Sequence, residues 1–257
     1  MPALLLKLVL TPLLVGLASL AGRRWGAEVG GWLVGIPLTS GPIAFFLAIG
    51  PGTHFAADAS IGILAGTASQ AAFALAYAWT SLRLGWIACA GVASLAFVVT
   101  TVLLNAAHPA VLPTFGLAVG SLAVSLVLMP KRGARAAEAA GLPWWDIPLR
   151  MTVATAFVIA LTEAAPVLGS RLSGLLAPFP VYAMVLAVFA HRLQGTGAAT
   201  AVLRGLLLGL FSFTCFFLSI AELVVTQGIA VAFGVAIVVA LIVQALSLGA
   251  SRRYRLA

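Results

Sequence analysis

The chain has 257 residues, of which 63% are hydrophobic and 8% charged, and it carries a formal net charge of +8. A water-soluble domain carries roughly 25% charged residues, so this composition argues against a soluble enzyme, a disordered chain and a nucleic-acid reader. The two cysteines, Cys89 and Cys215, lie inside apolar runs and indicate neither a disulfide framework nor a metal site. We therefore expect the chain to reside in a lipid bilayer.

Nine stretches are apolar and long enough to cross a bilayer, which takes about 20 residues. In chain order they cover about residues 4–21, 30–49, 55–80, 84–104, 110–129, 148–164, 172–191, 197–220 and 223–249. The first stretch resembles a signal peptide, but Lys7 lies within it and no polar cleavage region with small residues comes before Arg23. Counting it as a span, the sequence predicts an all-α integral membrane protein with nine transmembrane helices.

The basic residues are distributed unevenly between the two sides of these spans. Eleven of the fourteen bases fall in loops after odd-numbered spans or at the C-terminus, whereas Lys7 and Arg171 fall on the other side and Arg204 lies within a span. Cytoplasmic loops carry an excess of Lys and Arg. We therefore expect a periplasmic N-terminus, a cytoplasmic C-terminus and a cytoplasmic loop at about residues 130–147.

The sequence repeats itself at an offset of 143 residues. Between residues 26 and 66, 12 of 41 positions are identical to their partners in 169–209. The identities include backbone-determining residues, namely Gly26 with Gly169, Gly31 with Gly174, Pro37 with Pro180, Gly52 with Gly195, Gly62 with Gly205 and Gly66 with Gly209. Because glycine permits unusual backbone angles or close helix contact, and proline removes a backbone donor, the backbone path is what repeats.

Each copy of this repeat holds four spans, and the two copies start five spans apart. Because that offset is odd, the second copy must be inverted in the membrane. We expect repeat 1 in residues 1–105, a linker helix and cytoplasmic loop in 106–147, and the inverted repeat 2 in 148–257, which gives a 4+1+4 arrangement. Inverted repeats that meet at the bilayer midplane are typical of many secondary transporters.

The second and seventh spans are interrupted at matching positions. Gly35, Pro37, Gly41 and Pro42 interrupt the second, and Pro178 and Pro180 interrupt the seventh. An interrupted helix frees backbone groups that lipid cannot satisfy, and paired interruptions point to a transport site. The alternative is a pair of proline kinks that only shape packing. We expect the substrate-binding residues to include those at the two interruptions: Pro37, Thr39, Ser40, Pro178, Pro180 and Tyr182.

Polar residues within the spans are further candidates, because each is costly in lipid. Arg204 is predicted to bind an anionic substrate, with snorkelling toward the cytoplasmic surface as its alternative. Asp58 and His54 are candidates for a coupling ion or proton, although Asp58 could simply stabilise its helix N-terminus and His54 could lie at the membrane interface. Gln70, in the middle of the third span, is a candidate ligand contact.

The second half resembles a known family. Gly174-Leu-Leu-Ala-Pro-Phe-Pro-Val-Tyr182, Gly195, the run 201–205 and Phe216-Phe217 are similar to the GlpM-type small inner-membrane proteins of bacteria, which have four spans. The likeness covers about residues 149–248, and the first half has Ile61 where the second has Arg204. The resemblance implies a fused, diverged duplication in a bacterial inner membrane, loosely connected with envelope polysaccharide production.

Three functions follow as hypotheses. The first is a small secondary transporter or flippase for an anionic small molecule or a phosphate-bearing lipid. The second is a non-transporting accessory of an envelope-polysaccharide or lipid biosynthesis complex, which could also be a homodimer. The third, a membrane-embedded lipid enzyme, is the weakest, because no catalytic motif, metal-ligand spacing or nucleotide fingerprint is present. We expect no catalytic residue, metal, cofactor or nucleic-acid partner.

Overall fold

The computed structural model describes residues 36–106, 110–130 and 145–255, together with residues 8–13, 16–17, 20, 24 and 32–33. Every element in these ranges is a helix. In chain order they are α3 (Ser40–Ile49), α4 (Thr53–Thr80), α5 (Trp86–Asn105), α6 (Val111–Leu128), α7 (Asp146–Leu176), α8 (Val181–Gln194), α9 (Thr196–Leu223) and α10 (Gly228–Arg255). The first predicted span, 4–21, and the start of the second lie largely outside the described residues.

Six of these helices, α4, α5, α6, α7, α9 and α10, are long and apolar enough to cross a membrane. The faces of α5, α6 and α10 expose large apolar side chains such as Leu103, Val127 and Leu246. An apolar surface of this extent is not stable in water. The chain is therefore a multi-pass membrane protein, as the composition predicts.

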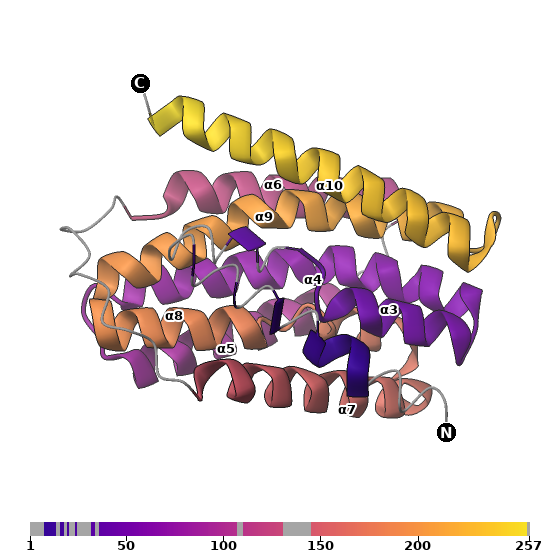
Figure 1. Cartoon of the computed structure of the whole chain (residues 1–257), viewed down its shortest axis with the longest axis horizontal. Coiled ribbons are helices and arrows are strands. Elements are labelled where there is room, and N and C mark those ends of the chain that lie inside the picture. Colours follow the sequence, from indigo (N-terminus) through magenta and orange to yellow (C-terminus); the bar gives the residue numbers. More distant parts are fainter. Residues whose placement is uncertain are drawn as a thin grey trace.

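Two helices lie at the centre of the bundle. α4 contacts α3, α5, α6, α7 and α9, and α9 contacts α6, α8 and α10 as well. Figure 1 shows these long helices side by side, with α10 along one face of the bundle and α7 along another. The two central helices are also those with the most extensively buried apolar stretches.

The repeat that the sequence predicts is visible in the helix bounds. α9 begins and ends 143 residues after α4, and both helices have 28 residues. Each is preceded by a glycine with positive φ, Gly52 at 117° and Gly195 at 86°. Side chains other than glycine rarely adopt such angles, which explains why these two positions are identical. A polar contact also repeats, because Ser69 bonds Thr101 and Ser212 bonds Gln244 at the equivalent positions.

The seventh predicted span is divided between two elements. α7 bends sharply at Gly169, where φ is 78° and ψ is 166°, so that the segment after Gly169 runs back along the bundle. A single residue therefore replaces the loop expected between the sixth and seventh spans. The returning segment ends at Leu176, and after a short irregular stretch the chain continues as α8.

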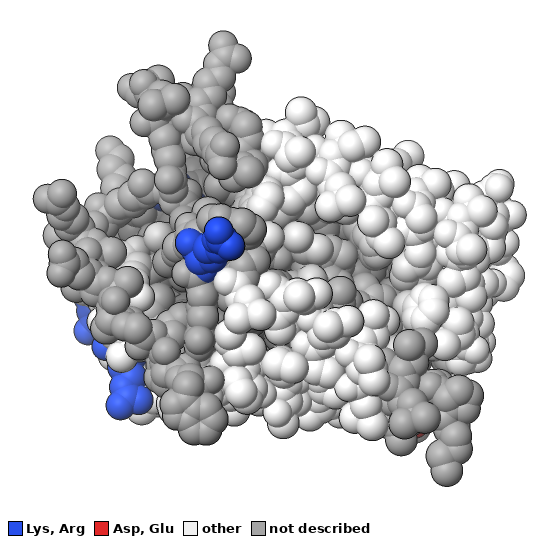
Figure 2. All heavy atoms as spheres, in the orientation of Figure 1, with Lys and Arg blue, Asp and Glu red and all other residues white. Residues whose placement is uncertain are grey.

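Charged side chains are separated between the two ends of the bundle. Arg83 follows the C-terminal end of α4, and Arg192 lies in the last turn of α8, at the same end. Asp58 lies near the start of α4, at the opposite end of that helix. In Figure 2 the basic side chains lie in the left part of the view, and most of the remaining described surface is uncharged. Which of the two ends faces the cytoplasm remains a prediction.

Candidate functional site: a pocket between two interrupted helices

Both predicted interruptions are present in the structure. Before α3 the chain is irregular over residues 36–39, and between α7 and α8 it is irregular over 177–180. Local bonds close each interruption: the Leu38 amide donates to Ile36 over 2.7 Å, and the Phe179 amide donates to Leu176 over 2.9 Å. Because proline has no amide hydrogen and disfavours a helical residue before it, Pro37 and Pro180 explain why neither span continues as a regular helix.

The two interruptions touch each other although 137 residues separate them. The Ser40 hydroxyl, at the start of α3, donates a 2.8 Å hydrogen bond to the carbonyl oxygen of Ala177. From this contact α3 runs toward one end of the bundle and α8 toward the other (Figure 1). Two helix N-termini therefore converge at the middle of the bundle.

A small pocket lies at this convergence, with a volume of about 20 Å³. That is room for about one water molecule. Six residues predicted at the site line it: Thr39, Ser40, Gln70, Pro178, Pro180 and Tyr182. Six further lining residues were not predicted: Ile36, Leu38, Phe179, Val181, Ala183 and Phe213. The described lining contains no charged side chain.

The lining residues reflect the internal repeat. Ten of the twelve form five pairs at the 143-residue offset, namely Ile36 with Phe179, Leu38 with Val181, Thr39 with Tyr182, Ser40 with Ala183 and Gln70 with Phe213. The two halves of the chain therefore contribute equivalent backbone positions with different side chains. The offset is the sequence signal that would have added Phe213 to the predicted site, through its partner Gln70.

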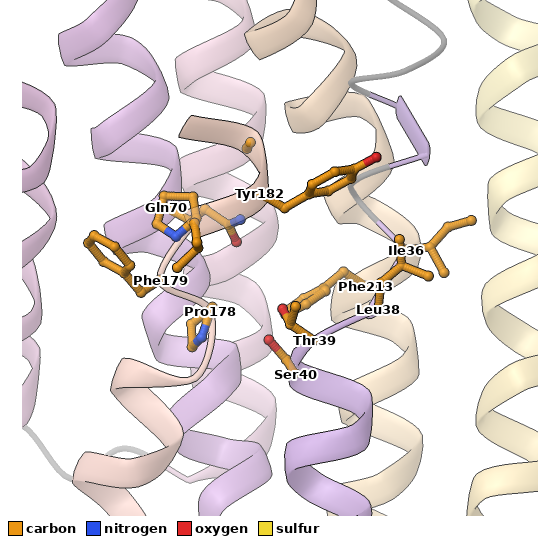
Figure 3. Close-up of a pocket in the computed structure, with 12 residues that line it drawn as sticks. Ile36, Leu38, Thr39, Ser40, Gln70, Pro178, Phe179, Tyr182 and Phe213 are labelled. Carbon is orange, nitrogen blue, oxygen red and sulfur yellow. The ribbon is translucent and has the colours of Figure 1, made fainter. Parts of the chain in front are cut away.

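Gln70 supplies a polar side chain in the middle of α4. It is only 5% exposed, and its Oε1 atom has no hydrogen-bond partner in the described part of the chain. Figure 3 shows its amide directed into the space between the two interruptions, with Thr39 and Ser40 across from it. A buried acceptor without a donor destabilises a fold by roughly 1–3 kcal/mol. Its position therefore calls for a ligand or water as a partner.

The helix N-termini add backbone donors to the same pocket. The first amides of any helix have no carbonyl partner within it. The Gly41 and Met184 amides are satisfied by Pro37 and Pro180. Among the described residues, no backbone acceptor is recorded for the amides of Ser40 and Ala183, which line the pocket.

Aromatic packing fixes the walls of the pocket. Phe179 meets Phe97 of α5 edge-on with ring centroids 5.1 Å apart, and it meets Phe157 of α7 at 6.2 Å. Tyr182 packs with Leu38, Met151 and Ala154. These contacts hold the interruption at residues 177–180 against helices on both sides.

Arg204, predicted to bind an anion at this site, does not line the pocket. Its Nη2 atom donates a 3.3 Å hydrogen bond to the carbonyl oxygen of Pro130, just after the end of α6. Arg204 lies nine residues before Phe213 on α9, about 14 Å along the helix axis. Because its side chain is directed to the end of a neighbouring helix, the placement of its positive charge at the interruptions is corrected.

Asp58 and His54 also lie away from the pocket. Both are exposed near the start of α4. Asp58 precedes Gln70 by twelve residues, about 18 Å along the helix axis. Pro37 is buried next to Gly41 but is not itself part of the pocket lining. Of the predicted site residues, the structure thus brings together those at the interruptions and Gln70, and not the charged ones.

Comparison of the chain with protein-family models, with curated proteins and with solved structures gave no match. The resemblance to GlpM-type proteins therefore stays a sequence-based prediction. Within the described residues, no three His, Cys, Asp or Glu side chains are close enough together to hold a metal ion.

Proposed function

We propose that the protein is a small secondary transporter or flippase of the bacterial inner membrane whose ligand site is the pocket between the interrupted helices. The observation that carries the proposal is the convergence of two helix N-termini and the buried, unpartnered Gln70 amide on one pocket. Half-helices that end at a shared midplane pocket are how many secondary transporters bind substrate. A purely structural kink needs no such polar group.

The proposed architecture is the 4+1+4 arrangement of nine spans, with α6 as the linker. Its support is the pairing of α4 with α9 at the 143-residue offset and the paired lining residues of the pocket. A site formed by equivalent positions of two repeats lies on the axis that relates them. Exchanging the conformations of two inverted repeats would then open that site to the opposite side of the membrane.

Transport requires movement, because the pocket is too small for an organic solute as it stands. A candidate sliding surface lies beside it, where the returning segment of α7 crosses α4. A Cβ atom added at Gly62 would lie 2.6 Å from the carbonyl oxygen of Arg171, and one at Gly66 would lie 2.5 Å from Cγ of Pro178. Glycine contacts let helix backbones approach closely in membranes, and this segment leads directly into the interruption at 177–180.

The proposed substrate is an anionic small molecule or the anionic head group of a lipid. With Arg204 elsewhere, the support for negative charge comes from the two helix N-termini, each equivalent to roughly half a positive charge. Orientation with the N-terminus outside and the C-terminus inside is part of the proposal. An accessory protein of an envelope-biosynthesis complex is the competing function, and it requires no water-accessible site.

Amide hydrogen exchange of the wild-type protein in lipid nanodiscs separates these two functions. If the pocket admits water, peptides covering residues 36–41 and 177–183 are expected to exchange at least about tenfold faster than the central parts of α4 and α9, at 62–74 and 205–217. Equal protection of the interruptions and the central helices would indicate a bundle packed throughout, as expected for an accessory, and would contradict the transporter proposal.

A further inference from the structure

We propose that the pocket binds one small, singly charged anion that also carries a hydrogen-bond donor, such as a 2-hydroxycarboxylate. This inference rests on the proposed function, because it assumes that the pocket is a ligand site. It narrows the substrate from anions in general to a class defined by one negative charge and one O–H or N–H group.

The negative charge follows from the helix N-termini. The amides of Ser40 and Ala183 belong to the first turns of α3 and α8, which have 10 and 14 residues, and both residues line the pocket. The opposing carbonyl of Ala177, where α7 ends, already accepts the Ser40 hydroxyl. The pocket therefore presents donors from two helices, which favours an acceptor group with negative charge.

The single charge follows from the absence of a formal positive charge in the described lining. Two helix N-termini together amount to roughly one elementary positive charge. A doubly charged phosphate or sulfate would leave about one negative charge uncompensated in a poorly hydrated site, which is strongly unfavourable. The pocket volume of about 20 Å³ also favours a small group over a lipid head group.

The donor on the ligand follows from Gln70. Its Oε1 atom is buried without a hydrogen-bond partner, and its amide points into the pocket (Figure 3). An amide oxygen accepts hydrogen bonds, so a bound carboxylate alone leaves it unsatisfied. At the equivalent position of the second repeat stands Phe213, which offers only an aromatic surface. The hydroxyl of the ligand is therefore directed toward α4 and its apolar side toward α9.

Thermal unfolding of the purified full-length protein in detergent, with added glycolate or acetate, tests this directly, because the two anions differ by one hydroxyl. We expect glycolate at 100-fold excess over its dissociation constant to raise the melting temperature by about 5–10 °C. One additional hydrogen bond corresponds to glycolate binding about fivefold to tenfold more tightly than acetate. Sulfate and glycerol 3-phosphate are expected to produce no shift.

Two variants of Gln70 assign the effect to that side chain. Gln70→Met keeps the length of the side chain, and it is expected to remove the preference for glycolate while acetate still binds. Gln70→Glu places a negative charge in the pocket and is expected to abolish both shifts at neutral pH. Thr67→Val is the matched control, because Thr67 is buried one turn earlier on α4 and bonds only the carbonyl oxygen of Ile63. It is expected to bind as the wild type does.

The outcomes distinguish this inference from the proposed function. Equal shifts by glycolate and acetate in the wild type would overturn the donor requirement. A shift by sulfate or glycerol 3-phosphate that Gln70→Glu removes would overturn the single charge. If no anion shifts the melting temperature while the interruptions still exchange rapidly, the anion inference fails and the water-accessible site stands. If the interruptions are protected as well, both fail.

Discussion

Substitution of Gly174 by alanine is expected to destabilise the protein by about 3 kcal/mol or more. Gly174 lies in the returning segment of α7, where a Cβ atom would overlap the carbonyl oxygen of Ala59 and lie 2.9 Å from Cα of Gly62. Both neighbours are backbone atoms of α4 and cannot rotate away. The whole segment would have to move off α4, taking the interruption at residues 177–180 with it.

Titration with a denaturing detergent in mixed micelles measures this loss as a change in the free energy of unfolding. Gly120→Ala is the control, because Gly120 lies within α6 and has no atom within 4 Å of an added Cβ. Alanine favours a helix over glycine by up to about 1 kcal/mol, so this variant is expected to equal or exceed the wild type. If Gly174→Ala is as stable as Gly120→Ala, the close crossing of α4 and α7 is wrong.

Substitution of Ser40 by alanine is expected to destabilise the protein by about 1–3 kcal/mol, because it leaves the carbonyl oxygen of Ala177 without a donor in the middle of the bundle. The matched control is Ser60→Ala. Ser60 is equally buried, but its hydroxyl donates to the carbonyl of Ala56 on its own helix, four residues earlier. That carbonyl also accepts in the helix, so the control is expected to lose little stability.

The same titration of the free energy of unfolding compares the two serine variants. A threonine variant, Ser40→Thr, retains the hydroxyl and is expected to recover much of the loss. If Ser40→Ala and Ser60→Ala lose the same amount, the hydrogen bond between the interruptions contributes nothing to holding them together. The contact would then be incidental to the pocket.

The backbone of the site could be predicted from the sequence, because glycine and proline determine it. Pro37 and Pro180 indicated the two interruptions, and both are present at the aligned positions. Gly52 and Gly195 aligned because each needs a positive φ before a long helix. The 143-residue offset then implied that α4 and α9 are equivalent, and their bounds agree with it.

The side chains of the site were harder to predict. In an apolar chain the faces directed to lipid and to the core have similar composition, so periodicity does not identify which residues face inward. Phe213 and Phe179 were therefore missed, and Gln70 was found only because it is polar. The sharp bend at Gly169 was also missed, because a single glycine resembles many others in this sequence.

Arg204 shows a different limit of sequence reasoning. Its depth along the predicted span was estimated correctly as near one end, but depth does not reveal what the side chain reaches. Its partner, the carbonyl oxygen of Pro130, lies 74 residues earlier in the chain. Snorkelling toward a helix end was the alternative interpretation, and a long flexible side chain makes such a contact easily.

Reaction of a single cysteine at Thr39 with a membrane-impermeant thiol reagent tests the central claim most directly. Thr39 lines the pocket, and Cys89 and Cys215 are first replaced by alanine so that no other thiol reacts. Ala74→Cys is the control, because Ala74 is fully buried one turn beyond Gln70 on α4 and is expected to react from neither side. In vesicles of both orientations, a site that opens alternately is expected to make Thr39→Cys reactive from each side. Reaction from one side only, or from neither, would contradict the account.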